Sequence, residues 1–356
     1  MSVRRALLVL LAALVALALA AAWVAAGLKR LDDPLNVSAP LRFKVSPGSR
    51  FAHVAADLAQ RGVIAEPRVW VLYARFKGMA ASIKAGEYEI EPGATPRSLL
   101  LKMVNGQVLL HSFTIVDGWR VADMLAAMKR NPDITSTLPD PPEGSPSGSP
   151  NGLMERLGSP RAQPGSDAEG QFLPETYRFP SGTTDIELLK QAHAALLREL
   201  DSAWASRDPS VPLHSAEELL IVASIVQKES GVPQELPKIA GLYLHRLRIG
   251  MRLQADPTVI YGLGEHYDGA LHAVDLRADG PYNTYTRAGL PPTPIALAGA
   301  AAIEATAHPE STDALYFVAS PRDDGSHVFS ATLEEQNAAV ARYVAHLHAR
   351  AAEDAK

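Results

Sequence analysis

Four kinds of hydrophobic pattern follow one another along the 356-residue chain. Residues 6–27 are apolar and uncharged, which is long enough for one membrane-spanning helix. Residues 42–130 alternate between strand-like runs and amphipathic helical stretches. Residues 131–168 are polar and rich in proline, and residues 169–350 show mainly helical periodicity. The pattern predicts an α+β protein with a single N-terminal transmembrane helix, a small α/β subdomain, and a mainly helical lobe that contains a short sheet.

The α/β part repeats one local arrangement three times. A strand-like run is followed by a two-residue turn and then by an amphipathic helix. The turns lie at Pro47-Gly48, Pro92-Gly93 and Asp117-Gly118. Such turns are common in proteins, but their recurrence in the same context predicts small α/β modules packed side by side over 42–130.

A proline-rich tract separates this part from the helical lobe. Residues 139–150, "PDPPEGSPSGSP", contain five prolines, two glycines and three serines. This composition cannot build a core, and residues 159–170 are similar. Between them, "NGLMERLG" predicts one or two helical turns. We therefore predict a flexible crossing segment over 131–168.

Helical periodicity dominates the rest of the chain. A long amphipathic helix is predicted over 184–206. The segments "ALYFVAS" and "HVFSAT" predict a strand pair near the C-terminus. Thr332 and Glu335 then have the spacing of a capping box, which predicts a final helix.

A single carboxylate ends the helix predicted over 216–230. Ser215 and Glu218 have capping-box spacing at its start, and Gly231 marks its end. Glu229 shares one face with the apolar residues of this helix. Burial and the negative partial charge at the helix C-terminus both disfavour its anion, so its pKa should be raised. A protonated acid of this kind suits catalysis at a glycosidic oxygen, whereas a frayed and solvated helix end is the alternative.

Three segments that mix aromatic and hydrogen-bonding residues flank this acid in the sequence. They are "EGQFLPETYRFP" (169–180), "RLQADPTVIYGLG" (252–264) and "PYNTYTRAGLPPTPI" (281–295). Aromatic rings together with amide and hydroxyl groups suit sugar binding, so the segments predict a groove beside the acid. Structured loops with buried tyrosines are the alternative. The candidate binding residues are Glu175, Gln254, Asp256, Tyr282, Asn283 and Tyr285.

Composition narrows the classes of function. The net charge is −5 and no Lys/Arg stripe occurs, which gives no reason to expect nucleic acid. The absence of cysteine excludes disulfides and Cys-ligated zinc. The 11 histidines lack metal-ligand spacing, and no phosphate-binding or GxSxG motif occurs. Ser230 and Lys228 diverge around their helix, which argues against a Ser/Lys hydrolase. No metal or cofactor is expected.

The N-terminal span determines the expected compartment. Arg4 and Arg5 precede it and Lys29 and Arg30 follow it, so the flanking charges are nearly balanced. A secretory signal has a shorter apolar core, which favours a retained anchor, although "ALAAAW" is compatible with cleavage. We predict a single-pass protein of the inner (plasma) membrane whose body is periplasmic or extracytoplasmic. The expected limits are a cytoplasmic tail over 1–5, the span over 6–27 and a spacer over 28–41.

Five motifs occur in order along the chain: "EGQFLPETY", "ASIVQKES", "HRLRIGMRLQADPTVIYGLG", "YNTYTRAGLPPTPI" and "AHPESTDALYFVA". Over about residues 35–345 they resemble the YceG-like family, the MltG endolytic peptidoglycan transglycosylases. The resemblance implies a LysM-like subdomain at about 42–110, within the modules of 42–130, and a catalytic domain over 169–350. The family motif "ASIVEKE" has two acids, and here Gln227 replaces the first and leaves Glu229. The chain also departs from the family at "LAG" (297–299) and in the 139–150 tract, which resembles an insertion.

The resemblance also implies a reaction. Glu229 would cleave the β-1,4 bond between N-acetylmuramic acid and N-acetylglucosamine without water, leaving a 1,6-anhydro end, while the candidate binding residues orient the sugars. Partners would be nascent glycan strands, the membrane and a peptidoglycan synthase, and cleavage would end strand elongation. Two alternatives remain open: a muramidase that uses Asp256 or Glu175 as a second carboxylate, and a non-catalytic wall-binding scaffold.

Overall fold

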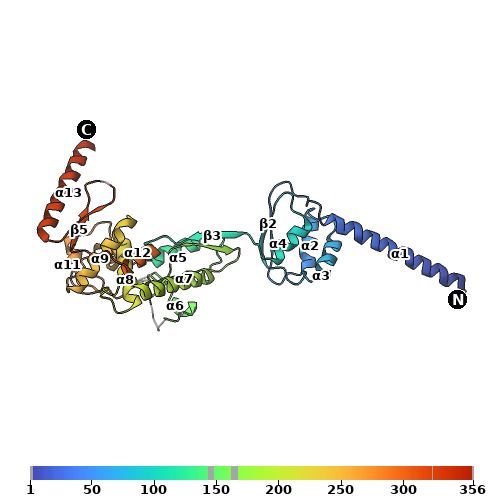
Figure 1. The fold of residues 1–356 in the computed structure, drawn as a ribbon, viewed down its shortest axis with the longest axis horizontal. Coiled ribbons are helices and arrows are strands. Elements are labelled where there is room, and N and C mark those ends of the chain that lie inside the picture. Colours follow the sequence, from blue (N-terminus) through green and yellow to red (C-terminus); the bar gives the residue numbers. More distant parts are fainter. Residues whose placement is uncertain (1–2, 143–147, 162–166, 323, 355–356) are drawn as a thin grey trace. The chain divides into compact units, whose positions relative to one another are not determined.

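The computed structural model (Figure 1) divides into two compact units, which we describe separately. Unit 1 comprises Met1–His111 and Arg178–Gly182, and unit 2 comprises Ser112–Tyr177 and Thr183–Lys356. The described residues are 3–142, 148–161, 167–322 and 324–354. The predicted cytoplasmic tail and flexible segment therefore lie partly outside the described residues, at 1–2, 143–147 and 162–166. One N-terminal apolar helix, a mostly helical body and small two-stranded sheets confirm the α+β class.

Helix α1 (Val3–Arg30) forms the N-terminal part of unit 1. Its residues Leu10–Arg30 have a mean hydropathy of 2.3 and are almost entirely uncovered, so this helix is long and apolar enough to cross a membrane, as a signal sequence would also be. Only its last turns pack on the rest of the unit. A Cβ on Gly27 would lie 2.6 Å from a methyl group of Val69, so glycine permits this close approach.

The core of unit 1 lies between a two-stranded sheet and three helices. Strand β1 (Leu41–Val45) pairs antiparallel with β2 (Gly86–Ile90), with Phe43 opposite Tyr88. Their rings stack at 5.6 Å between centroids. Alternate residues of both strands are buried, as the period of a strand requires. The covering helices are α2 (Phe51–Gln60), α3 (Pro67–Phe76) and α4 (Pro96–Val104).

The three predicted strand–turn–helix repeats are all present. Gly48, Gly93 and Gly118 each have a positive φ, between 76° and 88°, which explains the glycine in each turn. The third repeat, β3 (Leu110–Thr114) and α5 (Val121–Arg130), does not continue the first two. Its turn and helix belong to unit 2. Within unit 2, Gly118 N donates to Leu297 O, so this third turn bonds to a residue far along the sequence.

Strand β3 pairs with β4 (Thr176–Pro180), and the boundary between the units falls within both strands.

Unit 2 is otherwise built around packed helices. Helix α12 (Ala300–Ala307) contacts three others, and its small side chains permit close packing. The three are α7 (Asp185–Ser206), α8 (Ala216–Glu229) and α9 (Leu236–Arg248). Shorter helices are α6 (Leu153–Leu157), η1 (Pro233–Glu235), α10 (Asp256–Leu263), η2 (Gly264–His266) and α11 (Ala273–Arg277).

The C-terminal part of unit 2 carries the predicted strand pair. Strand β5 (Tyr316–Ala319) pairs antiparallel with β6 (His327–Ser330), and α13 (Leu333–Asp354) follows. Thr332 Oγ1 accepts from Glu335 N, and the Glu335 carboxylate accepts from Thr332 N, so the predicted capping box is confirmed.

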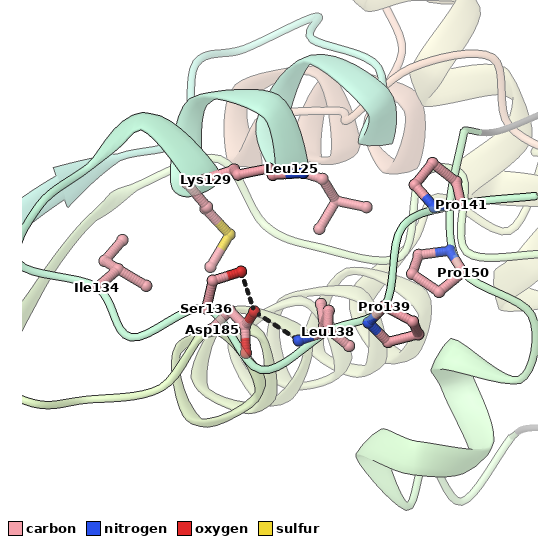
Figure 2. A pocket seen from close by; sticks show the side chains of 10 residues that line it. Leu125, Lys129, Ile134, Ser136, Leu138, Pro139, Pro141, Pro150 and Asp185 are labelled. Atoms are coloured by element: carbon pink, nitrogen blue, oxygen red, sulfur yellow. Dashed lines mark hydrogen bonds between the residues drawn. The ribbon is translucent and has the colours of Figure 1, made fainter.

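The described part of the proline-rich segment makes specific contacts with unit 2. Asp185, at the start of α7, accepts hydrogen bonds from Thr137 N at 2.8 Å and Leu138 N at 3.0 Å. Burial opposes the Asp185 anion, but a bond from the Thr137 hydroxyl and the backbone bonds together outweigh it and lower its pKa. Asp185 also lines a cavity of about 50 Å³ together with Pro139, Pro141 and Pro150, and Figure 2 shows these side chains. Further along, Leu153, Met154 and Leu157 of α6 are buried.

Candidate active site

Helix α8 determines where Glu229 lies. Ser215 Oγ accepts from Glu218 N at 3.1 Å, and the Glu218 carboxylate accepts from His214 N at 2.6 Å. The predicted residues therefore cap the start of the helix, although Glu218 bonds to the N–H group of His214 and not to that of Ser215. The helix ends at Glu229, one residue earlier than predicted, because Ser230 is extended. Unlike a helix with a single apolar face, α8 is buried on all sides from Leu219 to Val226.

The last turn of α8 is fixed from two sides. Gln227 Oε1 accepts from Gly299 N at 3.1 Å, at the start of α12. Lys228 Nζ donates to Gly118 O at 3.2 Å, in the third turn. Gln227 stands where the family motif has an acid, and here it accepts a hydrogen bond from the backbone. These two bonds hold the turn that carries Glu229.

The Glu229 carboxyl group is partly buried, and one side-chain donor bonds to it among the described residues. Tyr243, which is 2% exposed on α9, donates its hydroxyl hydrogen to Glu229 Oε1. Burial raises the pKa of Glu229 to about 7, and the nearby Asp256 charge adds to this effect. The bond from Tyr243 and the charge of Arg246 act in the opposite direction. The raised pKa agrees with the direction expected from the sequence, and a large share of Glu229 is protonated at neutral pH.

Glu229 lines a cleft of about 280 Å³ in unit 2. Three of the predicted binding residues share this cleft: Gln254, Asp256 and Tyr285. Tyr285 donates its hydroxyl hydrogen to Asp256 Oδ1 at 2.5 Å. Gln254 has a φ of 49°, and it is the only non-glycine residue with a positive φ among the described residues. Backbone strain of this kind is concentrated at functional sites.

The other three predicted residues do not line this cleft. The Asn283 amide donates to the Ala278 carbonyl at 2.7 Å, and Asn283 Oδ1 accepts from Tyr285 N at 2.9 Å. Asn283 therefore supports the loop that places Tyr285. Tyr282 bonds through its hydroxyl to Thr293 Oγ1 at 2.8 Å. Glu175 is exposed just before β4.

Five residues of the cleft were missed from the sequence. They come from α9, β5 and α13 and are Tyr243, Arg246, Tyr316, Phe317 and Gln336. Arg246 is 6% exposed and donates through Nε to Leu315 O at 2.7 Å. In the sequence, the one signal that α9 contributes to the cleft is a tyrosine and an arginine three residues apart within the apolar stretch "IAGLYLHRL".

Gln336 carries an unused acceptor in the cleft. Its Nε2 donates to Phe317 O at 3.0 Å. This bond fixes the orientation of the amide, because a flipped amide would place two oxygens together. Gln336 Oε1 is buried and has no hydrogen-bond partner among the described residues. A buried acceptor without a donor is costly, so this atom is a candidate contact for a ligand.

A second pocket, of about 460 Å³, lies toward the start of α8. The segment 169–180, which was expected to flank the acid, contributes here through Glu169 and Gln171. Glu169 is fully buried, and its Oε1 accepts from Val121 N at 3.0 Å, at the start of α5. Burial raises the pKa of Glu169 to about 7, against the bond from Val121 and the charge of Arg120. Only two of the three predicted segments therefore form the cleft with Glu229.

A partly buried acid with a pKa of about 7, in a cleft of aromatic, amide and carboxylate side chains, has the properties of an acid–base site. Residues 43–342 match the YceG-like family. The chain belongs to this family, as its motifs predicted.

Two relatives with similar sequences share the name endolytic murein transglycosylase. The endolytic murein transglycosylase of Bacillus subtilis (strain 168) is 29% identical over 331 residues, which is 89% of each chain. The endolytic murein transglycosylase of Streptococcus pneumoniae serotype 2 (strain D39 / NCTC 7466) is 26% identical over 330 residues. That match covers 84% of this chain and 58% of the streptococcal protein. A crystal structure of a yceG-like protein from Listeria monocytogenes shares 27% identity, with a TM-score of 0.47, over 85% of this chain and 99% of that one.

Proposed function

We propose that the chain is a lyase of peptidoglycan, an endolytic murein transglycosylase. The family membership and the names of its relatives support the activity. The observation that carries the proposal is the placement of Glu229, a partly buried acid with a pKa of about 7 that lines an open cleft. Such a group can donate a proton and later accept one at neutral pH.

The bond cleaved is the β-1,4 link between N-acetylmuramic acid and N-acetylglucosamine. The protonated Glu229 donates its proton to the departing glycosidic oxygen as the bond to C1 breaks. The Glu229 carboxylate then takes the proton of the muramic acid 6-hydroxyl, whose oxygen bonds to C1. Every atom of the substrate stays in the two products, one of which ends in 1,6-anhydro-N-acetylmuramic acid. One carboxylate therefore suffices, whereas glycoside hydrolysis uses two.

The other side chains of the cleft orient this reaction. Tyr243 holds the Glu229 carboxyl group through its hydroxyl. The Asp256 carboxylate, which bonds to Tyr285, stabilises positive charge that develops near C1. Gln254 and Gln336 bind hydroxyl or amide groups of the sugars, and Gln336 Oε1 is a buried acceptor that has no partner among the described residues.

A two-carboxylate muramidase is the second candidate, and Asp256 is the observation in its favour. Asp256 lines the same cleft, and its charge raises the pKa of Glu229. It could then activate a water molecule, as the second carboxylate of a hydrolase does. Glu175 is a poorer second carboxylate, because it is exposed and does not line the cleft.

The masses of the products distinguish the two reactions. The full chain in detergent is incubated with purified glycan strands, and the new ends are weighed by mass spectrometry. We expect anhydro ends, which are lighter than reducing ends by one water. Reducing ends would instead identify a muramidase, and intact strands would favour a wall-binding scaffold.

We further propose the cellular setting. Helix α1 anchors the chain in the inner membrane with a cytoplasmic tail, and the body lies on the periplasmic or extracytoplasmic side. Cleavage of nascent strands near the membrane would end their elongation, with a peptidoglycan synthase as partner. The small α/β part of unit 1 is the candidate LysM-like glycan-binding subdomain. Cell fractionation and protease protection of the full chain test the anchor and its orientation.

A further inference from the structure

Helix α3 of unit 1 exposes two large apolar side chains to solvent. Phe76 is 85% exposed and Leu72 is 50% exposed. They lie four residues apart and therefore on one face of the helix. The opposite face, with Trp70 and Ala74, is buried in the core of the unit. This outer apolar face is not needed for the fold of unit 1.

The same face carries positive charge. Arg68 and Arg75 are exposed and lie four residues before and three residues after Leu72, and exposed Lys77 follows the helix. Apolar side chains flanked by arginine and lysine on an exposed helical face are typical of helices that lie in a membrane interface. The basic side chains then contact anionic headgroups while the apolar ones enter the acyl region.

Two contacts show how α3 lies against the apolar helix α1. Gly27 packs on Val69, and Arg30 forms an ion pair with Glu66 at 3.1 Å. Moving forward along α1 from Gly27 to Arg30 corresponds to moving backward along α3. The two helices therefore run antiparallel, and the C-terminal end of α3 points back toward the N-terminal part of α1.

This direction brings the exposed residues to the level of the apolar span. Phe76 follows Val69 by seven residues, a rise of roughly 10 Å at about 1.5 Å per residue. It is therefore roughly level with the Ala20–Trp23 turn of α1, inside the apolar stretch Leu10–Arg30. Trp23 is itself 47% exposed, and tryptophan is enriched at membrane interfaces.

We propose that the outer face of α3 is a second membrane contact, in which Leu72 and Phe76 insert into the bilayer interface beside α1. The inference rests on the proposed anchoring by α1 and goes beyond it. The partner is the lipid bilayer itself: Arg68 contacts anionic headgroups, and the long side chains of Arg75 and Lys77 extend back toward them. Unit 1 is then held against the membrane surface and is not a body that swings freely from a tether.

Single cysteines test the insertion, because the chain has none of its own. The full chain is prepared with Leu72→Cys, with Phe76→Cys and, as a matched control, with Leu110→Cys. Leu110 is also in unit 1 and is 51% exposed, close to the value for Leu72. The chain from α1 enters the sheet at Leu41, opposite Ile90. Leu110 lies near the other end of the sheet, because the preceding Leu109 bonds to Glu87, next to Gly86.

Each variant carries an environment-sensitive fluorophore and is reconstituted into vesicles of phosphatidylethanolamine and phosphatidylglycerol. We expect labels at 72 and 76 to be quenched by brominated acyl chains, and the label at 110 to report water. Before labelling, the rate at which a water-soluble maleimide modifies each thiol is measured. The Phe76→Cys thiol should react at least about tenfold more slowly than the Leu110→Cys thiol, because insertion into the bilayer shields it from the aqueous reagent.

The outcomes separate this inference from the proposed anchor. Flotation of the vesicles reports whether α1 holds the chain in the bilayer. If the chain floats while the labels at 72 and 76 stay in water, the proposed contact is overturned and the anchor stands. The face would then be free to bind another protein. If the chain does not float, the anchor itself fails. Replacing phosphatidylglycerol with neutral phosphatidylcholine should weaken the quenching at 72 and 76.

Discussion

The two ends of helix α8 lie near two glutamates that have the same acidity and different surroundings. Glu169, in the pocket toward the start of α8, and Glu229, at its end, both have a pKa raised to about 7 by burial. Glu169 is fully buried and accepts hydrogen bonds from the backbone N–H groups of Val121 and Gly170. Glu229 accepts a hydrogen bond from the Tyr243 hydroxyl and faces an open cleft. A shifted pKa therefore does not identify a catalytic acid, and access to a substrate decides between the two.

The largest expected effect comes from removing the acid in the cleft. Glu229→Gln keeps the shape of the side chain but cannot donate or accept the catalytic proton. We expect cleavage of glycan strands to fall by about 10²- to 10⁴-fold, measured by the release of soluble fragments. Glu169→Gln is the matched control and should retain cleavage within severalfold. Wild-type cleavage by Glu229→Gln would show that the acid lies elsewhere.

The next effect separates stability from activity. Glu169→Ala leaves the start of α5 without its buried acceptor, so the free energy of unfolding should fall by about 1–3 kcal/mol. Chemical denaturation of the full chain in detergent measures this loss, and the folded variant should still cleave. A folded Glu169→Ala protein that has lost all activity would contradict the contrast between the two acids.

The pH dependence of stability follows from the same acid. The pKa of Glu169 is higher in the folded chain than in the unfolded chain, so the folded state binds its proton more tightly. The stabilisation is complete below the ordinary pKa of 4.5 and is lost as the pH rises through about 7. Glu169→Gln should remove this contribution, which denaturation of both proteins between these pH values would show as a flatter profile.

A fourth prediction concerns the pH dependence of cleavage. Because Glu229 must be protonated to begin the reaction, kcat/KM should fall by about tenfold per pH unit above pH 7. Tyr243→Phe removes a hydrogen bond that stabilises the Glu229 anion, so this limb should move to higher pH by up to about one unit. Glu169→Gln should leave the limb in place. A limb that moves to lower pH in Tyr243→Phe would refute the role given to this tyrosine.

The smallest expected effect concerns sugar binding. Gln336→Leu removes the free acceptor in the cleft, which should raise KM by several-fold, the value of about one neutral hydrogen bond, with little change in kcat. Initial rates over a range of glycan concentrations measure both constants. Gln171→Leu, in the second pocket, is the control and should change neither. An unchanged KM in Gln336→Leu would exclude this contact.

Local signals in the sequence predicted much of the fold and part of the site. The spacing of Ser215, Glu218 and Gly231 fixes the limits of α8 within one residue, because capping depends on neighbours in the chain. The third Asp-Gly turn has the same local pattern as the first two, yet its partner is Leu297. Nothing near Gly118 in the sequence could show this contact.

The site shows the same division between local and distant information. Gln254, Asp256 and Tyr285 lie in segments whose polar composition marks them, and they share the cleft with Glu229. Asn283 has the same kind of composition but bonds to backbone carbonyls. Gln336 lies in an ordinary amphipathic helix and reaches the cleft only because α13 packs on β5. Residue type alone cannot separate these cases.

The buried bond between Tyr243 and Glu229 has a consequence for proton traffic. Burial and the Glu229 charge raise the pKa of Tyr243 well above its usual value, so this hydroxyl keeps its proton throughout turnover. The proton that Glu229 gives to the first product therefore has one replacement, the hydrogen of the muramic acid 6-hydroxyl. In the proposed reaction the enzyme thus recovers its starting protonation state from the substrate itself, and it needs no channel, relay or buffer ion to reset the site between successive cuts.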